Sequence, residues 1–138
     1  SIHAYILGEH GDSSFPVISS ATVGGQALNN LDNFSEEQAL KAYTKSRDAA
    51  YKIIETKGAT YYGIGAVVAH IVSKILRDAR SVLPLSIPLH QYHGHSGVAL
   101  SVPCILGRAG VKETLQAKLD WNEKLKLEKA VKTLKQYL

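Results

Sequence analysis

A histidine with neighbouring glycines and carboxylates lies close to the start of the chain. The segment GEHGDSS, residues 8–14, places His10 between Glu9 and Gly11, directly after an apolar run. Imidazole accepts and donates protons near neutral pH, so one histidine can serve a reaction in both directions. Oxidation of an alcohol needs such a group, because the hydroxyl loses its proton as hydride leaves the carbon. His10 is therefore a candidate acid–base residue, while the simpler interpretation is a polar residue in a glycine turn.

Two other sets of reactive side chains lie further along the chain. His90, His93 and His95 are close in sequence and could share a metal ion, since imidazole is a common ligand. No cysteine or carboxylate joins them, and a hairpin tip is a poor scaffold for a tetrahedral site, so we predict no metal. Cys104 lies in an apolar segment whose nearest basic residue is Arg108, which predicts a small buried side chain rather than a nucleophile.

The composition is that of one globular domain. The chain has 138 residues, of which 45% are hydrophobic and 20% charged, which is enough apolar material for a core. A single cysteine excludes an internal disulfide and suits the reducing cytoplasm, where we expect the protein to be located. No apolar run is long enough to span a membrane and no signal peptide is visible. We therefore expect no membrane partner.

The net charge does not indicate nucleic-acid binding. Most of the excess of +4 comes from the segment after residue 111, where lysines alternate with acidic residues. Alternating charges are typical of a solvated helix face. Because arginines and interleaved aromatic residues are scarce, we predict no nucleic-acid partner.

The first half of the chain predicts two strands followed by two helices. Residues 2–7 and 15–23 read as strands, separated by a glycine loop. Ser35 with Gln38 fits a capping box that opens a helix, and Gly58 is a typical C-terminal residue for it. A second helix is expected from about residue 60 to about residue 79. It is apolar nearly all round, which predicts a buried helix.

The second half predicts a hairpin and a C-terminal helix. Residues 81–90 and 98–106 read as strands joined through HGHSG, and GRAGV as a turn that leads into the last helix. Asp120 and Glu123 form a second capping box. The helix then shows an apolar stripe, formed by Leu127, Ala130, Val131, Leu134 and Leu138. We therefore predict an α+β fold with antiparallel strands, and no dinucleotide-binding fingerprint is present.

Three segments resemble the L-lactate and malate dehydrogenase family, and bacterial L-lactate dehydrogenases most closely. They are HAYILGEHGDSSFPV at residues 3–17, KGATYYGIG at 57–65 and SVPCILGRAG at 101–110. The resemblance implies that residues 1–138 form one substrate-binding domain, the C-terminal half of an enzyme that interconverts pyruvate and L-lactate. NAD would be bound mainly by a nucleotide-binding domain upstream. The absence of methionine and the opening Ser1-Ile2-His3, which reads as part of a strand, agree with a missing upstream part.

The resemblance also implies roles for four residues. His10 occupies the place of the proton donor and acceptor, and Thr60 that of a threonine that contacts the substrate. Ile64 falls where an apolar side chain packs on the nicotinamide ring. His3 falls where allosteric members bind a phosphate of fructose 1,6-bisphosphate at an interface of a homotetramer. Each has a simpler interpretation: Thr60 as a helix cap, Ile64 as core and His3 as an ordinary strand residue.

The resemblance leaves the substrate open. In this family the carboxylate that orients the histidine and the arginines that contact the substrate precede Ser1, and Asp12 is not assigned the orienting role. Ile18 and Ser20 differ from the common bacterial pattern. We expect a cytoplasmic enzyme of glycolysis and pyruvate fermentation whose isolated C-terminal half is inactive. The alternatives are a malate or other 2-hydroxy acid dehydrogenase, and a non-catalytic assembly module.

Overall fold

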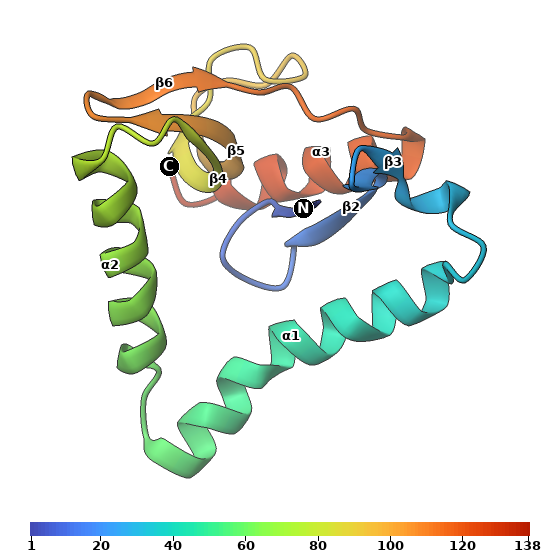
Figure 1. Cartoon of the computed structure of the whole chain (residues 1–138), viewed down its shortest axis with the longest axis horizontal. Helices are drawn as coiled ribbons and strands as arrows, with labels where there is room; N and C mark the ends of the chain where they lie inside the picture. The colour runs from blue at the N-terminus through green and yellow to red at the C-terminus, as the bar shows by residue number, and fades with distance from the viewer.

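Two small antiparallel sheets and three long helices make up the chain, and the computed structural model describes all residues from 1 to 138 (Figure 1). The first sheet has the order β1 (Ile2–Leu7), β2 (Phe15–Val23) and β3 (Gln26–Ala27). The second has the order β4 (Ser81–Pro88), β5 (Ala99–Gly107) and β6 (Gly110–Thr114). Because every strand pair is antiparallel, the predicted α+β class is confirmed.

The register of β1 and β2 sets the position of the His10 loop. Leu7 pairs with Phe15, so residues 8–14 form the connection at that end of the pair. Gly8 begins the connection with a φ of 101°, and its carbonyl accepts a hydrogen bond from Ser101 of β5 at 3.1 Å. A Cβ at Gly8 would lie 3.0 Å from the Ser13 carbonyl oxygen. The backbone angle and the close approach together require glycine here.

Local signals determined both ends of α1 (Glu36–Lys57), which is preceded by the 3-10 turn η1 (Leu28–Asn30). The Ser35 side chain accepts a hydrogen bond from the Gln38 amide at 3.3 Å, which is the first half of the predicted capping box. Gly58 ends the helix in the left-handed conformation, and its amide donates to the Ile54 carbonyl at 2.8 Å. Both predicted termini are therefore confirmed.

The predicted burial of α2 (Tyr61–Leu76) is wrong for this chain. No residue of α2 is buried, and Tyr62 is 78% exposed. Figure 1 shows α1 and α2 as two sides of a V whose corner lies away from the sheets. An apolar composition predicts that other protein surface packs against a helix. It does not predict whether that surface belongs to the same domain. The helix also ends at Leu76 rather than near residue 79, because Asp78 and Arg80 adopt left-handed backbone angles.

A short strand replaces the predicted turn into the last helix. Gly110 has a φ of 95° and reverses the chain, so that β6 pairs with β5 and Gly107 lies opposite Gly110. This strand is short and polar, and β3 has only two residues, so neither has the periodicity that marks a strand. The two predicted strands of the hairpin are confirmed, at 81–88 and 99–107.

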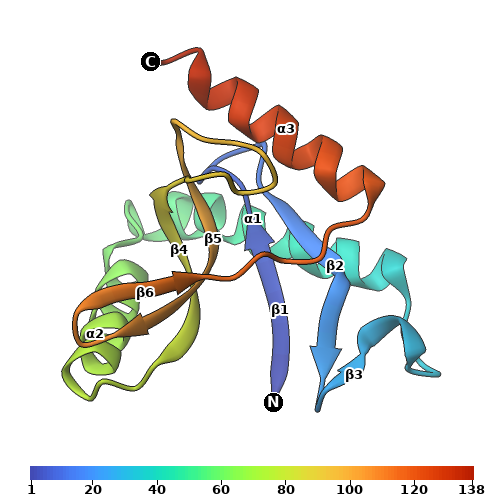
Figure 2. The same ribbon diagram turned by 90° about the horizontal axis from the view of Figure 1, so that it is seen from above.

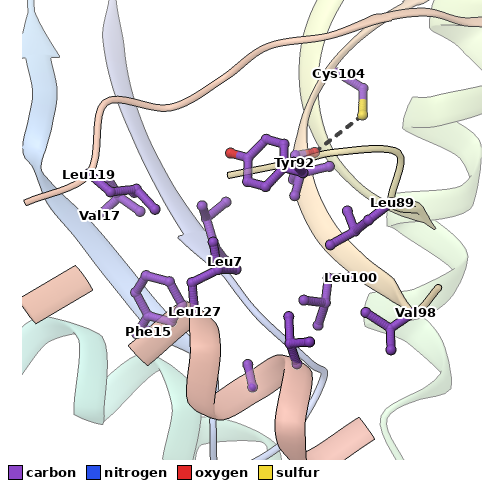
Figure 3. Close-up of a cluster of buried hydrophobic side chains, with 13 residues drawn as sticks. Leu7, Phe15, Val17, Leu89, Tyr92, Val98, Leu100, Cys104, Leu119 and Leu127 are labelled. Carbon is purple, nitrogen blue, oxygen red and sulfur yellow. Dashed lines mark hydrogen bonds between the residues drawn. The ribbon is translucent and has the colours of Figure 1, made fainter. Parts of the chain in front are cut away.

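The core lies where the two sheets meet α3 (Trp121–Lys135) (Figures 2 and 3). Both sheets, the 89–98 loop, the segment before α3 and α3 itself contribute its buried side chains: Leu7, Phe15, Val17, Leu89, Tyr92, Val98, Leu100, Val102, Cys104, Leu119, Leu127, Ala130 and Val131. The inner part of the predicted apolar stripe of α3 is thus confirmed. Leu138 is not part of it, because it follows the end of the helix and is 88% exposed.

One buried carboxylate ties α3 to the first sheet. Glu123 is only 4% exposed, and its oxygens accept hydrogen bonds from the amides of Ile18 at 2.8 Å and of Ser19 at 3.0 Å. The Ser19 hydroxyl also donates to it. The Asp120 amide donates to Glu123 at 3.0 Å, and the Asp120 side chain accepts from the Glu123 amide at 2.7 Å. The predicted capping box is therefore confirmed, and its glutamate also bonds to the backbone of β2.

We predict that Glu123→Gln destabilises the fold by about 2–3 kcal/mol, because an amide group would face backbone donors that now bond to a carboxylate. Urea unfolding of the protein that contains this chain measures the effect. Glu128→Gln is the matched control, since Glu128 lies on the same helix in an exposed pair with Lys132 and should change stability by less than about 0.5 kcal/mol. Equal unfolding midpoints for the two variants would contradict the role of Glu123.

Candidate functional site

The loop of residues 8–14 is folded on itself and leaves His10 exposed. The amide and hydroxyl of Ser13 both donate to Glu9 Oε1, at 3.2 and 2.7 Å. The amide and hydroxyl of Ser14 both donate to the Gly11 carbonyl, at 3.1 and 2.8 Å. His10 is exposed and takes part in none of the side-chain hydrogen bonds of the loop. The loop therefore holds its shape without using the imidazole, which is open to a substrate.

Helix α1 contacts this loop through one tyrosine. The Tyr43 hydroxyl donates to the Ser14 carbonyl at 2.6 Å and lies 2.9 Å from the Ser14 hydroxyl. The Arg47 guanidinium lies over the Tyr43 ring, 5.9 Å from its centroid. A hydrogen bond and ion pair with Asp48 raise the pKa of Arg47, and the charge of Asp12 in the loop acts in the same direction. Sequence reasoning did not find this contact, because Tyr43 and Ser14 are distant in the chain and no local pattern links them.

Thr60 and Ile64 lie at the start of α2. Thr60 is the N-cap residue, and its carbonyl accepts from the Ile64 amide at 3.3 Å, but its side chain makes no capping hydrogen bond. The hydroxyl is therefore not used by the cap. Ile64 is 57% exposed and is not part of the core of this chain. No hydrogen bond joins His10 to Thr60, so the chain positions the acid–base candidate and the substrate-contact candidate on separate elements.

Thr60 and Ile64 also bear on whether the residues of this chain fit NAD. An exposed apolar side chain at Ile64, one turn after an uncommitted hydroxyl, fits a residue that packs against a nicotinamide ring. No glycine-rich loop between a strand and a helix is present to hold the dinucleotide phosphates. The residues here thus fit one edge of a cofactor site and not its phosphate-binding part.

His3 is an exposed residue of β1. It pairs with Thr22 of β2, and its Nδ1 lies 3.4 Å from the Tyr5 hydroxyl. The pairing of β1 and β2 is irregular between His3 and Tyr5. His3 is therefore available at the surface of the first sheet, at the end of β1 opposite the His10 loop.

Two of the three histidines of the 89–98 loop, His93 and His95, make hydrogen bonds that hold that loop. His93 Nε2 lies 2.9 Å from the Ala117 carbonyl, and Tyr92 and His95 exchange two backbone hydrogen bonds of 3.0 and 2.9 Å. The Tyr92 hydroxyl accepts from the Ala117 amide at 3.2 Å. No group of three or more histidine, cysteine or acidic side chains is arranged to hold a metal ion. The loop is thereby fastened to the segment that precedes α3.

Cys104 lies in the core, as its apolar neighbourhood predicted. Its side chain is fully buried, and its thiol donates to the Val102 carbonyl at 3.3 Å (Figure 3). Burial raises the pKa of the Cys104 thiol, so the nucleophilic thiolate is disfavoured. Burial likewise raises the pKa of the Tyr92 phenol. None of the helices combines the length and apolarity that crossing a bilayer requires.

Comparison with known proteins identifies the family. The model of the lactate/malate dehydrogenase, alpha/beta C-terminal domain, matches residues 1–138. The chain belongs to the lactate/malate dehydrogenase family. It is 46% identical over 140 residues to L-lactate dehydrogenase 1 of Bacillus cereus, covering 99% of this chain and 45% of that protein. It is 42% identical over 142 residues to L-lactate dehydrogenase 1 of Enterococcus faecalis, covering 100% and 43%.

Solved structures of the family share the fold. The minor L-lactate dehydrogenase from Enterococcus mundtii has a TM-score of 0.90 at 37% identity, over 99% of this chain and 45% of that one. The malate dehydrogenase from Aeropyrum pernix has a TM-score of 0.86 at 31% identity, with the same coverage. The chain thus spans less than half the length of the relatives it matches, and both substrate classes of the family occur among them.

Proposed function

We propose that this chain is the substrate-binding half of an NAD-dependent L-lactate dehydrogenase. The observation that carries the proposal is the exposed His10, held on a hydrogen-bonded loop in a chain 46% identical to a bacterial L-lactate dehydrogenase. An upstream nucleotide-binding domain completes the enzyme. The complete protein is a cytoplasmic homotetramer that acts in glycolysis and pyruvate fermentation.

The reaction needs one proton and one hydride. NADH, held mainly by the upstream domain, supplies the hydride. His10 donates its proton to the carbonyl oxygen of pyruvate, and in the reverse direction it removes the hydroxyl proton of L-lactate. The hydroxyl of Thr60 would contact the substrate, and the side chain of Ile64 would supply an apolar surface for the nicotinamide ring and exclude water there.

Malate dehydrogenase activity is the second candidate. The similarity to the Aeropyrum pernix malate dehydrogenase favours it, and the departures at Ile18 and Ser20 from the common bacterial pattern leave the substrate open. The ratio of kcat/KM for pyruvate to that for oxaloacetate, measured on the complete protein, separates the two. An assembly module without catalysis would turn over neither.

We predict that the isolated chain of residues 1–138 neither binds NADH tightly nor reduces pyruvate, because it has no phosphate-binding loop for a dinucleotide. Fluorescence titration with NADH and an absorbance assay with pyruvate test this. Measurable turnover by the purified chain would contradict it.

In the complete enzyme, His10→Asn should lower kcat by about two to four orders of magnitude, since the amide cannot transfer the proton. Steady-state kinetics with saturating pyruvate and NADH provide the measurement. His90→Asn is the control, because His90 is also an exposed loop histidine and should leave kcat unchanged. If His10→Asn retains the wild-type rate, His10 is only a turn residue.

His3→Gln should weaken activation by fructose 1,6-bisphosphate while leaving the rate without activator unchanged. Loss of one charge-assisted hydrogen bond to a phosphate corresponds to a rise of about tenfold or more in the half-activating concentration. The experiment is a titration of the bisphosphate against rate at fixed pyruvate, with His95→Gln as the control. Overlapping curves for His3→Gln and wild type would show that His3 has no part in activation.

A further inference from the structure

A single side chain fastens α1 to the loop that carries His10. The Tyr43 hydroxyl donates to the Ser14 carbonyl at 2.6 Å and lies 2.9 Å from the Ser14 hydroxyl, and no other side-chain hydrogen bond joins α1 to an earlier strand or its loops. The ion pairs of α1, Lys41 with Glu37 and Arg47 with Asp48, stay within the helix. The position of α1 against the loop therefore depends on Tyr43.

The burial pattern of α1 agrees. Of the residues from 36 to 57, only Ala39 and Tyr43 are half-buried, and the others are exposed. Ala39 and Tyr43 are one helical turn apart and share a face, so they define the line along which α1 touches the rest of the domain. Arg47, one turn further on, places its guanidinium over the ring of Tyr43, 5.9 Å from the centroid. Tyr43 thus contacts both Arg47 and the loop.

The hydrogen bonds continue from Tyr43 toward His10. Ser14, which bonds to Tyr43 through its carbonyl and hydroxyl oxygens, donates through both its amide and its hydroxyl to the Gly11 carbonyl. Gly11 is the residue directly after His10. Loss of the phenol oxygen would remove the donor to the Ser14 carbonyl, and the loop would then be held only by its internal hydrogen bonds, those of Ser13 to Glu9 and of Ser14 to Gly11.

The same helix leads to the substrate-contact candidate. After Gly58 ends α1, the chain reaches Thr60 within two residues. The contact of Tyr43 with Ser14 therefore helps to hold α1, and the Thr60 that follows it, in place relative to the loop. Acid–base catalysis is sensitive to that separation, since misplacement by about 1 Å can cost about a hundredfold in rate.

We propose that Tyr43 is a positioning residue for His10, which fixes the acid–base loop against α1 through Ser14. This inference rests on the proposed dehydrogenase function. Tyr43 touches no reacting atom, and its effect on the reaction is exerted through the loop.

The test is Tyr43→Phe in the complete enzyme, with Tyr51→Phe as the matched control. Tyr51 lies on the same helix, is 65% exposed and makes no hydrogen bond through its hydroxyl. Single-turnover oxidation of enzyme-bound NADH by saturating pyruvate gives a rate constant and an amplitude. We expect the rate constant to fall about tenfold in Tyr43→Phe and to stay at the wild-type value in Tyr51→Phe. A purely structural role would lower the amplitude, because fewer molecules are folded, and leave the rate constant unchanged.

Ser14→Ala provides an independent variant if Tyr43→Phe does not fold. It removes the Ser14 hydroxyl but keeps the 2.6 Å hydrogen bond from Tyr43 to the Ser14 carbonyl, which joins α1 to the loop, so the rate constant should fall by less than in Tyr43→Phe. The double variant should show less than the product of the two effects, because both changes disrupt one network. A wild-type rate constant in Tyr43→Phe, or fully independent effects, overturns the inference.

The experiments distinguish a failure of the role proposed for Tyr43 from a failure of the proposed dehydrogenase function. If the wild-type enzyme does not reduce pyruvate or oxaloacetate, or does not depend on His10, the proposed function fails. If His10→Asn is inactive and Tyr43→Phe behaves like Tyr51→Phe, the function stands and only the role of Tyr43 is wrong.

Discussion

The close approach of three elements at Gly8 is the constraint on which the rest of the domain depends. The Gly8 carbonyl bonds to Ser101 of β5, so this residue joins the first sheet to the second. A Cβ at Gly8 would meet the backbone of residues 13 and 14 on one side and Ala130 of α3, at 3.6 Å, on the other. A side chain here would therefore push apart the sheets, the helix and the start of the loop together. The His10 loop therefore begins at the residue where the two sheets and α3 come close together.

This arrangement separates stability from chemistry. Leu7, immediately before Gly8, and Leu127 of α3 are fully buried, whereas His10, two residues after Gly8, is exposed. The loop has a fixed base in the core and is held by its own hydrogen bonds to Glu9. The acid–base role proposed for His10 needs both properties, because the position of the ring must be reproducible while the ring stays open to the substrate.

Features with a local cause could be predicted from the sequence, and features that depend on distant residues could not. Ser35 and Asp120 mark helix starts because their side chains bond to amides three residues further on. Gly58 marks a helix end because it adopts the left-handed backbone conformation. The strand β6 was missed because its only support is a partner strand, and its own residues are mostly polar. In the site, the position of His10 in an exposed loop was predictable. Its link to Tyr43 was not, because it depends on how α1 lies across the loop.

The wrong prediction for α2 has a physical meaning of its own. A helix with its composition is expected in a core, yet Ile64 and its neighbours are exposed while the core forms elsewhere, around β1, β5 and α3. If α2 were packed against these sheets, Thr60 and Ile64 would lie inside the domain and could contact neither substrate nor cofactor. An apolar helix held outside the core can instead form a wall of a site that a second surface completes. The proposed reaction requires such a surface, because the hydride must come from a cofactor whose phosphates this chain has no loop to bind. The exposure of α2 therefore agrees with the proposed role of this domain as one half of an active site.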